Sequence, residues 1–505
     1  MSRFVGIDLG TQGLSVVLTE HDLTVVAAGE GGYGMVGGLG DGCYEQRAED
    51  WESALAEAVA SIAGPLAAGE IGAIGLAGQM HGEVLVDADG AVLAPARLWC
   101  DARNRAEGDE LTELFGCKVP RRCTVARWLW TLRNRPDIAS RVRHITTPAG
   151  WIAHRLAGDW TLGVGEASGV FPIDQSTLDY DRRMLAAFDE LVGDTAPARL
   201  AEMLPKVRRA GESAGEVTPA AAERFGVPAG VHVAPPEGDQ PASLAGSLIG
   251  EAGMIAASFG TSVCANAVGD RPFAGVSPAV DHFCAPDGKP INMVFLRNGT
   301  TFLNTVVGAL TAMAPDDDTF ADVMASAIDA PNDCGGLLAT PFMDDEPGLG
   351  VTEGGQAALL NLNATNANPG CMAKAALLAT VFNLRSGVEV LDAQGYPRTE
   401  IILSGGLAKT PALGQVIANA MQTPVVLLAS ADEGCAWGAA VLAKYRSQTA
   451  AGDEQSWGAF LRDHAPERLA RFEPDKKASR ELDEVYRRYQ QTPPLRAAAD
   501  NAGRA

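Results

Sequence analysis

The chain opens with short apolar segments separated by glycines and charged residues. Residues 4–8, 14–20 and 23–29 predict three strands, because each is an aliphatic run that ends at a turn such as LGTQG or HD. Residues 48–63 repeat apolar positions at three- and four-residue steps, which predicts a helix. Residues 71–77 predict a buried strand. Strands that alternate with helices in this way indicate an α/β protein.

The strand–turn–strand pattern of the N-terminus returns halfway along the chain. Residues 254–268 (MIAASFGTSVCANAV) place Gly-Thr between two apolar strands, as residues 4–20 do. A repeat at this spacing is too long for a solenoid and indicates two α/β domains of similar topology. We expect domains over residues 1–245 and 246–450, and a C-terminal helical extension and tail over residues 451–505.

The second half of the chain continues the alternation. We expect a long amphipathic helix over residues 373–391, a strand that ends in a double glycine at 398–406, and a helix at 407–421. A strand follows at 423–430 and a helix of small residues at 433–445.

Charge and cysteine content exclude several classes of protein. Lys and Arg number 40 and Asp and Glu 63, a net charge of −23, so the chain lacks the basic face that nucleic acids and anionic membranes need. No signal peptide and no run of about 20 apolar residues is present, which predicts a cytoplasmic protein. The nine cysteines form no CxxC pair and predict reduced thiols, with neither a disulfide framework nor a zinc site.

The two Gly-Thr turns are candidate phosphate sites. In residues 8–13 (DLGTQG), glycines allow close approach of the backbone, N–H groups and the Thr11 hydroxyl can bind phosphate oxygens, and Asp8 can orient Mg²⁺ through water. The alternative is a simple hairpin turn. The matching turn at residues 258–262 (SFGTS) favours a two-sided phosphate clamp. No GxxxxGK[ST] is present, so this is not a P-loop protein.

Three further segments follow predicted strands. Asp239, in EGDQPAS, reads either as a helix N-cap or as a general base for phosphoryl transfer to a hydroxyl. His81, in GQMHG, is positioned to bond a polyol, although a lone histidine is more often structural. The glycines at 405 and 406 allow a base or ribose to lie against the backbone, or else serve tight helix–strand packing.

Together, these segments resemble the FGGY family of carbohydrate kinases, within the actin-like ATPase superfamily, and most of all its xylulokinases. The resemblance is carried by FVGIDLGTQG, GLAGQMHGEVLVDADG with LWCDAR, EGDQPASLAG, ASFGTS and ILSGGLAKTPALGQVIANAM, in that order over residues 3–445. It implies two actin-like (ribonuclease H-like) ATPase domains flanking a catalytic cleft. It also implies ATP-dependent phosphorylation of a ketose hydroxyl, D-xylulose being the first choice.

The resemblance also assigns roles by position. Asp239 would be the catalytic base. The sugar would contact Gln79, Met80, His81, Asp239 and Gln240, and Asp8 and Asp239 would serve Mg²⁺, the cofactor that accompanies ATP. ATP would lie against Gly10, Thr11, Gln12, Gly13, Gly260, Thr261, Ser262, Gly405, Gly406 and Lys409. The expected partners are the sugar and ATP, with neither nucleic acid nor membrane, and a homodimer is left open.

Several departures from the family pattern concern the sugar, two of them at single positions. Gln240 stands where xylulokinases usually carry Asn, and Glu166 stands where Asp or Asn is common. Sedoheptulose, ribulose, erythritol or another polyol therefore stay open as substrates. A non-catalytic actin-like ATP-binding protein is a further alternative, and a catalytically dead sugar sensor ranks last because Asp239 is present.

Overall fold

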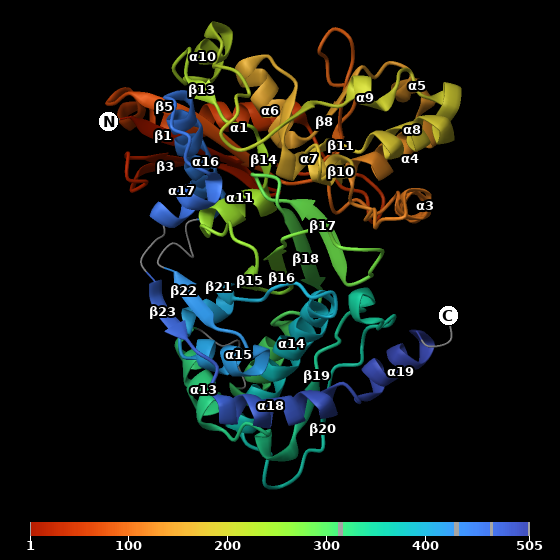
Figure 1. The fold of residues 1–505 in the computed structure, drawn as a ribbon, viewed down its shortest axis with the longest axis vertical. Helices are drawn as coiled ribbons and strands as arrows, with labels where there is room; N and C mark the ends of the chain where they lie inside the picture. The colour runs from red at the N-terminus through yellow and green to blue at the C-terminus, as the bar shows by residue number, and fades with distance from the viewer. Residues whose placement is uncertain (1, 312–316, 429–433, 465–467, 503–505) are drawn as a thin grey trace. The chain divides into compact units, whose positions relative to one another are not determined.

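The computed structural model describes residues 2–311, 317–428, 434–464 and 468–502 (Figure 1). The described residues divide into two compact units. The first contains the residues up to 250, residues 283–290 and residues 434–464. The second contains the remaining described residues from 251 onward. Residues 283–290 and 434–464 pack with the N-terminal unit, and residues 468–502 belong to the second unit. The boundaries at 245 and 450 stay predictions.

A mixed sheet forms the centre of the first unit. Its order is β13-β5-β1-β2-β3, with β14 also paired to β5. The expected hairpin of the N-terminus is β1 with β2, and β5 lies parallel to β1 on its other side. The strands are β1 (Arg3–Leu9), β2 (Gly13–Thr19), β3 (Val25–Gly32), β5 (Ile71–Gly78), β13 (His232–Val233) and β14 (Glu237–Gly238).

Helices cover both faces of this sheet. The predicted helix at 48–63 is α1 (Ala48–Ser61), which packs on β2 and β3. On the same face α6 (Pro148–Ala157) packs on β5 and β13, and α10 (Pro219–Phe225) packs on α1 and α6. On the other face lies α16 (Gly434–Ala450), against β1, β5 and α11 (Asp239–Gly246). Alternate residues of β1 account for this division, since Val5 and Ile7 join the α1 core and Phe4 joins the α16 core.

A separate helical core completes the first unit. It is formed mainly by α3 (Arg105–Phe115), α4 (Thr124–Asn134), α5 (Pro136–Ala139), α7 (Val164–Val170), α8 (Arg182–Val192) and α9 (Leu200–Met203). Two-stranded pairs edge this region: β4 (Glu45–Gln46) with β7 (Ala96–Arg97), β6 (Val84–Val86) with β8 (His144–Thr146), β9 (Thr161–Gly163) with β12 (Lys206–Arg208), and β10 (Ile173–Asp174) with β11 (Asp179–Tyr180). The remaining helices of this unit are α2 (Ala63–Ala67) and α17 (Trp457–Asp463).

One local prediction was only partly right. Residues 82–99 read as two strands around the turn at 88–90. In the structure only the isolated bridges Val86–Val92 and Glu83–Arg97 join these two segments, while β6 pairs with β8 and β7 with β4. Strands from elsewhere in the chain provide these partners, which a local pattern does not reveal.

The second unit repeats the arrangement of the first. The hairpin β15–β16 carries the second Gly-Thr turn, and β21 lies parallel to β15 as β5 does to β1. The sheet order is β17 (Val280–Cys284), β18 (Pro290–Leu296), β16 (Val263–Val268), β15 (Met254–Phe259), β21 (Glu400–Gly405), β22 (Val425–Leu428) and β23 (Arg468–Phe472). The predicted repeat is therefore real. The tail of the strand predicted at 423–430 and the first residue of the helix predicted at 433–445 lie outside the described residues.

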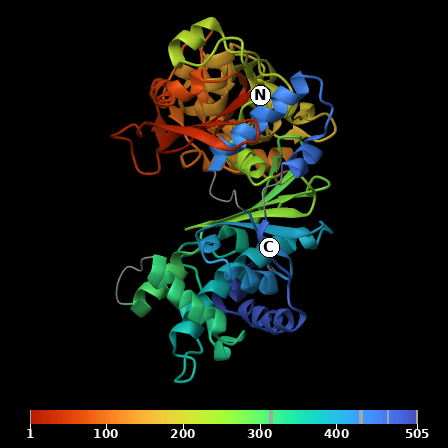
Figure 2. The same ribbon diagram turned by 90° about the vertical axis from the view of Figure 1, so that its left-hand side faces the viewer.

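Helices of the second unit pack on this sheet. The predicted long helix is α14 (Pro369–Asp392); it and α15 (Leu413–Met421) share one hydrophobic core with the strands, and α18 (Lys476–Tyr489) packs on them (Figures 1 and 2). The other elements are α12 (Thr301–Thr311), α13 (Asp317–Asp329), α19 (Pro493–Ala502), and β19 (Leu338–Thr340) paired with β20 (Ala358–Leu360).

Two further findings concern the chain as a whole. None of the nine cysteines, all of which lie in the described ranges, forms a disulfide bond. In the described part of the chain, every helix is too short or too polar to cross a membrane.

Candidate active site

Side chains of other segments form hydrogen bonds with the turn between β1 and β2. The Tyr33 hydroxyl, at the end of β3, donates to the carbonyl oxygens of Gly10 and Gly13, the latter at 3.0 Å. The Trp99 indole N–H donates to the Thr11 hydroxyl at 3.1 Å. Burial and the charge of Asp8 raise the pKa of Tyr33, so its phenol stays protonated and can donate. The first candidate phosphate turn therefore has a fixed shape.

Gln79 connects this turn to the sheet. It is buried, and its amide donates to the Gln46 side chain at 2.8 Å, while the Thr11 hydroxyl donates to its carbonyl oxygen at 3.4 Å. Gln46 in turn donates to the Thr11 carbonyl at 2.8 Å and accepts from Trp51 at 3.1 Å. These bonds tie Gln79 to the candidate phosphate turn. Its predicted contact with the sugar stays a prediction.

Met80 and His81 lie directly after β5 in a tightly packed turn. His81 adopts a left-handed backbone, with a φ of 68°, and its Nδ1 donates to the Gly169 carbonyl at 2.9 Å. A Cβ built at Gly169 would stand 2.8 Å from the His81 ring and 2.9 Å from the Met80 methyl carbon. Only glycine at position 169 fits this arrangement. The structure therefore brings together both residues of the predicted pair and fixes the imidazole.

Asp8 and Asp239 are two carboxylates at the ends of strands. Asp239 begins α11 directly after β14, and its Oδ1 accepts the Gln240 backbone N–H at 2.8 Å. Burial and the negative charge of Asp8 raise the pKa of Asp239 to about 7. Burial raises the pKa of Asp8 to about 6. Their neighbouring strands β14 and β1 both flank β5, so the structure brings these two predicted residues into one electrostatic site.

Two further carboxyl groups lie beneath Asp239, and our sequence analysis assigned neither to the site. Glu166 of α7 is fully buried, and burial holds its pKa well above the usual range. Glu237 accepts the Glu166 backbone N–H at 2.8 Å, and burial raises the pKa of Glu237 to about 8. A Cβ built at Gly238 would stand 2.5 Å from Glu166 Oε2. The EGD sequence of residues 237–239 does not by itself indicate that Glu166 packs against it, because that requires the position of α7.

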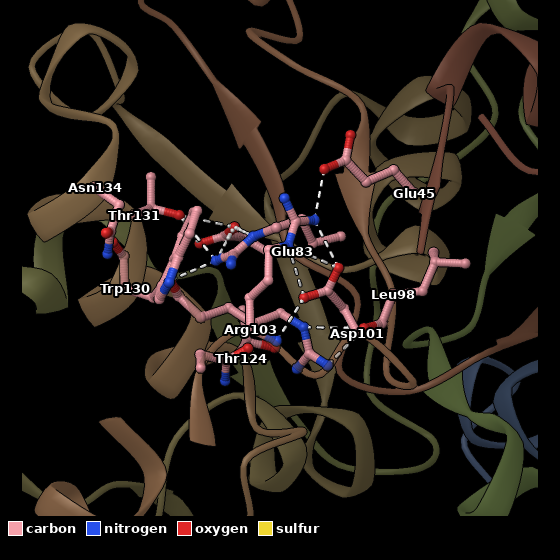
Figure 3. Close-up of polar contacts among 12 residues, drawn as sticks. Glu45, Glu83, Leu98, Asp101, Arg103, Thr124, Trp130, Thr131 and Asn134 are labelled. Carbon is pink, nitrogen blue, oxygen red and sulfur yellow. Dashed lines mark hydrogen bonds and ion pairs between the residues drawn. The ribbon is translucent and has the colours of Figure 1, made fainter. Parts of the chain in front are cut away.

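A network of ion pairs supports the segment that carries Trp99 (Figure 3). Arg97 binds Glu83 at 2.9 Å, and Arg103 binds Asp101 at 2.6 Å. The Trp130 ring lies near both guanidinium groups, with ring-centroid distances of 4.4 Å to Arg97 and 5.3 Å to Arg103. Sequence spacing does not indicate the Arg97–Glu83 pair, because its partners lie 14 residues apart, whereas Asp101 and Arg103 are near neighbours in one loop.

A second buried arginine joins this segment to α4. Arg127 is fully buried and donates to the Leu98 carbonyl at 3.1 Å and to the Arg122 carbonyl. Burial and the charge of Arg97 lower the pKa of Arg127 to about 10, which still leaves it charged at neutral pH. Arg127 thereby fixes the backbone at Arg122 and at Leu98, the residue before Trp99.

The nucleotide candidates of the second unit lie together at one end of its sheet. The Gly260 carbonyl accepts from the Thr300 N–H at 2.8 Å and from its hydroxyl at 2.9 Å, which ties the turn at 260–262 to the start of α12. Gly405 pairs with Phe259 in the next strand. Gly405 has a φ of 79°, and a Cβ there would stand 2.6 Å from the Phe259 carbonyl, so glycine is required. A 3₁₀ turn over Gly406–Lys409 follows.

The predicted residues therefore fall into two groups, one in each unit. The first unit holds Asp8, Gly10, Thr11, Gln12, Gly13, Gln79, Met80, His81, Asp239 and Gln240, and the second holds Gly260, Thr261, Ser262, Gly405, Gly406 and Lys409. Tyr33, Gln46 and Trp99 were missed, since nothing in their spacing links them to the turn they support.

The carboxylates fit a magnesium ion that is shared with a nucleotide. Within the ranges that the structure describes, no three His, Cys, Asp or Glu side chains form a metal-binding group. Mg²⁺ commonly takes only one or two carboxylates, with water and phosphate oxygens completing its six ligands. Asp8 Oδ1 is buried and makes no hydrogen bond within the described part of the chain. Such an oxygen is available to a cation or to water bound by one.

Two family models match the chain. The model for the N-terminal domain of the FGGY family of carbohydrate kinases matches residues 3–246, and the model for the C-terminal domain matches residues 255–447. These matches bear out the resemblance seen in the sequence.

Individual relatives agree with the family models. The chain is 30% identical to a xylulose kinase of Streptomyces coelicolor, covering 87% of both chains. It is 27% identical to a xylulose kinase of Escherichia coli, covering 98% of this chain and 100% of the relative. The crystal structure of a xylulose kinase from Rhodospirillum rubrum has a TM-score of 0.82 at 22% identity, covering 97% of both chains. The predicted two-domain actin-like α/β fold is confirmed.

Proposed function

Because the chain belongs to the FGGY family of carbohydrate kinases, we propose that it transfers the γ-phosphoryl group of ATP to a hydroxyl of D-xylulose, giving D-xylulose 5-phosphate. The single observation that carries this is the pair of partly buried, electrostatically coupled carboxyl groups, Asp8 and Asp239, beside the ordered Met80-His81 turn. Xylulose kinases among the relatives support the choice of sugar.

Asp239 is the proposed general base. As the phosphoryl group moves from ATP to the sugar, the attacking hydroxyl loses its proton to the Asp239 carboxylate, a new P–O bond forms, and the bond to the leaving ADP breaks. A pKa of about 7, raised by burial and by Asp8, places this carboxyl near working pH, where a base is both sufficiently ionised and sufficiently basic. The Gln240 N–H orients one carboxylate oxygen.

The sugar is proposed to lie against Met80, His81 and Gln240. Since His81 Nδ1 donates to the Gly169 carbonyl, Nε2 is the ring nitrogen proposed to bond a sugar hydroxyl. Met80 gives an apolar surface for the carbon face of the sugar. Gln240 offers an amide where the relatives' pattern has the shorter Asn, which gives it one methylene more of reach.

The phosphates of ATP are proposed to lie on the two Gly-Thr turns, and the adenosine at Gly405, Gly406 and Lys409. The first turn combines glycines and Thr11 on a backbone held by Tyr33. The second turn is held in a similar way by Thr300. Neither turn contains Lys or Arg. Backbone N–H groups and hydroxyls are the phosphate donors of this proposal.

Asp8 and Asp239 are the proposed magnesium ligands, directly or through water. When bound, Mg²⁺ neutralises phosphate charge and polarises the transferring group. Asp8 lies on β1, one residue before the strand ends at Leu9, so its carboxylate stands beside the first phosphate turn. This placement suits a carboxylate that orients the metal–nucleotide complex.

Two alternatives to D-xylulose kinase activity remain open. One is a kinase for another ketose or polyol, favoured by Gln240 and Glu166, which depart from the xylulokinase pattern. The other is an actin-like ATP-binding protein that phosphorylates no sugar, which has no need of the Met80-His81 turn.

A substrate panel tests the proposed function. ADP release with MgATP is measured for D-xylulose, D-ribulose, L-ketoses, sedoheptulose, glycerol and erythritol. We expect the highest kcat/KM with D-xylulose. If kcat/KM is higher with another sugar, that sugar is the substrate. If the protein binds ATP but releases no ADP with any sugar, it is the non-catalytic actin-like alternative.

A further inference from the structure

Residues 283–290 belong to the first unit, although β17 and β18 lie in the second sheet. These residues, the last two of β17, the link and the first of β18, are here called the hairpin tip. The Cys284 N–H donates to the Ser168 hydroxyl at 2.9 Å, and the Ala210 N–H donates to the Pro286 carbonyl at 2.7 Å. The tip is thus bonded to the same unit that holds the proposed sugar site.

The first residue of the hairpin tip is an aromatic residue in contact with His81. Phe283 is 5% exposed, and its ring centroid lies 5.5 Å from that of His81, with the two planes tilted by 46°. The Arg122 guanidinium carbon lies 5.7 Å from the same Phe283 centroid. These distances are typical of aromatic and cation–π contacts.

One helix end positions both rings. Ser168 accepts the N–H that anchors the hairpin tip, and Gly169, the next residue, accepts from His81 Nδ1. Ser168 also donates to the Gly165 carbonyl one turn earlier, which fixes its own hydroxyl in α7. His81, Phe283 and the Ser168-Gly169 pair therefore form a closed set of contacts, in which the imidazole is hydrogen-bonded through Nδ1 and packs against the Phe283 ring.

We propose that Phe283 is a positioning residue for the sugar: it holds the His81 imidazole in the orientation that presents Nε2 to a substrate hydroxyl. This inference rests on the proposed function, since it assigns Phe283 to that same site. The Phe283 ring lies against the imidazole and limits how far it can tilt about its Nδ1 bond. Phe283 acts through His81 and has no part in the chemical step.

Steady-state kinetics of Phe283→Leu test the proposal. Leucine retains apolar volume but removes the flat ring. We expect the KM for D-xylulose to rise about tenfold, because an aromatic pair contributes roughly that factor, while the KM for ATP changes less than about twofold. The matched control is Phe295→Leu, on β18 of the same hairpin, where the ring is 39% exposed and neither KM should change.

A double-mutant cycle separates positioning from direct binding or from general loosening. If Phe283 acts through His81, then adding Phe283→Leu to His81→Ala raises the sugar KM no further than His81→Ala alone. Equal multiplicative effects in both backgrounds would overturn the proposal. A lower melting temperature of Phe283→Leu with both KM values unchanged would also overturn it, since the role is then structural only.

A spectroscopic measurement tests the positioning role of Phe283 independently of the proposed kinase function. In ¹⁵N-histidine NMR of the full chain, His81 should show the Nδ1–H tautomer in the wild type and in Phe295→Leu, and an averaged signal in Phe283→Leu. If no sugar is phosphorylated but this difference is seen, the function fails and the positioning of His81 stands. An unchanged His81 signal in Phe283→Leu contradicts the inference even if the kinase activity is confirmed.

Discussion

At the scale of single residues, the candidate phosphate turn depends on a hydroxyl from a distant strand. Tyr33 contacts two carbonyl oxygens of the β1–β2 turn, on either side of Thr11. Two bonds from one rigid side chain fix the turn at two points, so the positions of its N–H groups are set before a ligand arrives. Preorganised donors of this kind need little rearrangement when phosphate binds.

Tyr33→Phe should therefore weaken nucleotide binding. We expect the KM for ATP to rise about fivefold, since the net contribution of a hydrogen bond is about 1 kcal/mol. The KM for the sugar should stay within about twofold. Tyr44→Phe is the matched control, because that ring is 42% exposed. An unchanged KM for ATP in Tyr33→Phe would mean that the turn holds its shape without the hydroxyl.

At the residue scale, the sequence could indicate candidate residues only where a side chain and its neighbours share one motif. Met80 and His81 were found because they follow a recognisable strand, and the structure orders them as a pair. Tyr33 and Phe283 could not be found in that way. Each reaches the site from a separate strand or hairpin, and only the folded chain brings it there.

At the scale of elements, the sheet of the first unit lies unusually close to α16. A Cβ built at Gly6 of β1 or at Gly75 of β5 would overlap the carbonyl oxygen of Ala436 or Ala439, respectively. The backbone of a helix can approach a sheet this closely only over glycines. These two glycines therefore determine how residues 434–450 pack against the β1–β5 pair.

Gly75→Ala should destabilise the first unit strongly. The added methyl group meets helix backbone, which cannot move aside as a side chain would, so we expect a loss of about 3 kcal/mol in unfolding free energy. Urea denaturation measures it. Gly64→Ala in α2 is the control, since a Cβ there meets no atom within 4 Å, and we expect no loss. Equal stability of the two variants would contradict the close approach.

The elements themselves were largely predictable, and their partners were not. Apolar periodicity identified α1, α14 and the strands β1, β2 and β5 close to their observed bounds. Periodicity does not reveal which distant element covers a face. Residues 434–464 pack with the first unit because Gly6 of β1 and Gly75 of β5 leave room for the backbone of α16. No local sequence pattern indicates this packing.

At the scale of the whole molecule, a chain of net charge −23 has to bind the polyanion ATP. In the proposed function, the phosphates bind at the two Gly-Thr turns, which contain glycine, threonine and serine but no cluster of Lys or Arg. Backbone N–H groups and a divalent cation must then offset the charge of the phosphates. Cytoplasmic location and a homodimer stay predictions from the sequence.

The most direct test of the central claim is the rate of ADP release with ATP and D-xylulose, compared between the wild type and Asp239→Asn. Asparagine retains the size of the side chain but cannot take up the proton. We predict Mg²⁺-dependent turnover by the wild type that is lost on chelation and restored by added Mg²⁺, and a fall of at least about 100-fold in kcat for Asp239→Asn at an unchanged melting temperature. Near-normal turnover by folded Asp239→Asn, or turnover without divalent metal, would contradict the account.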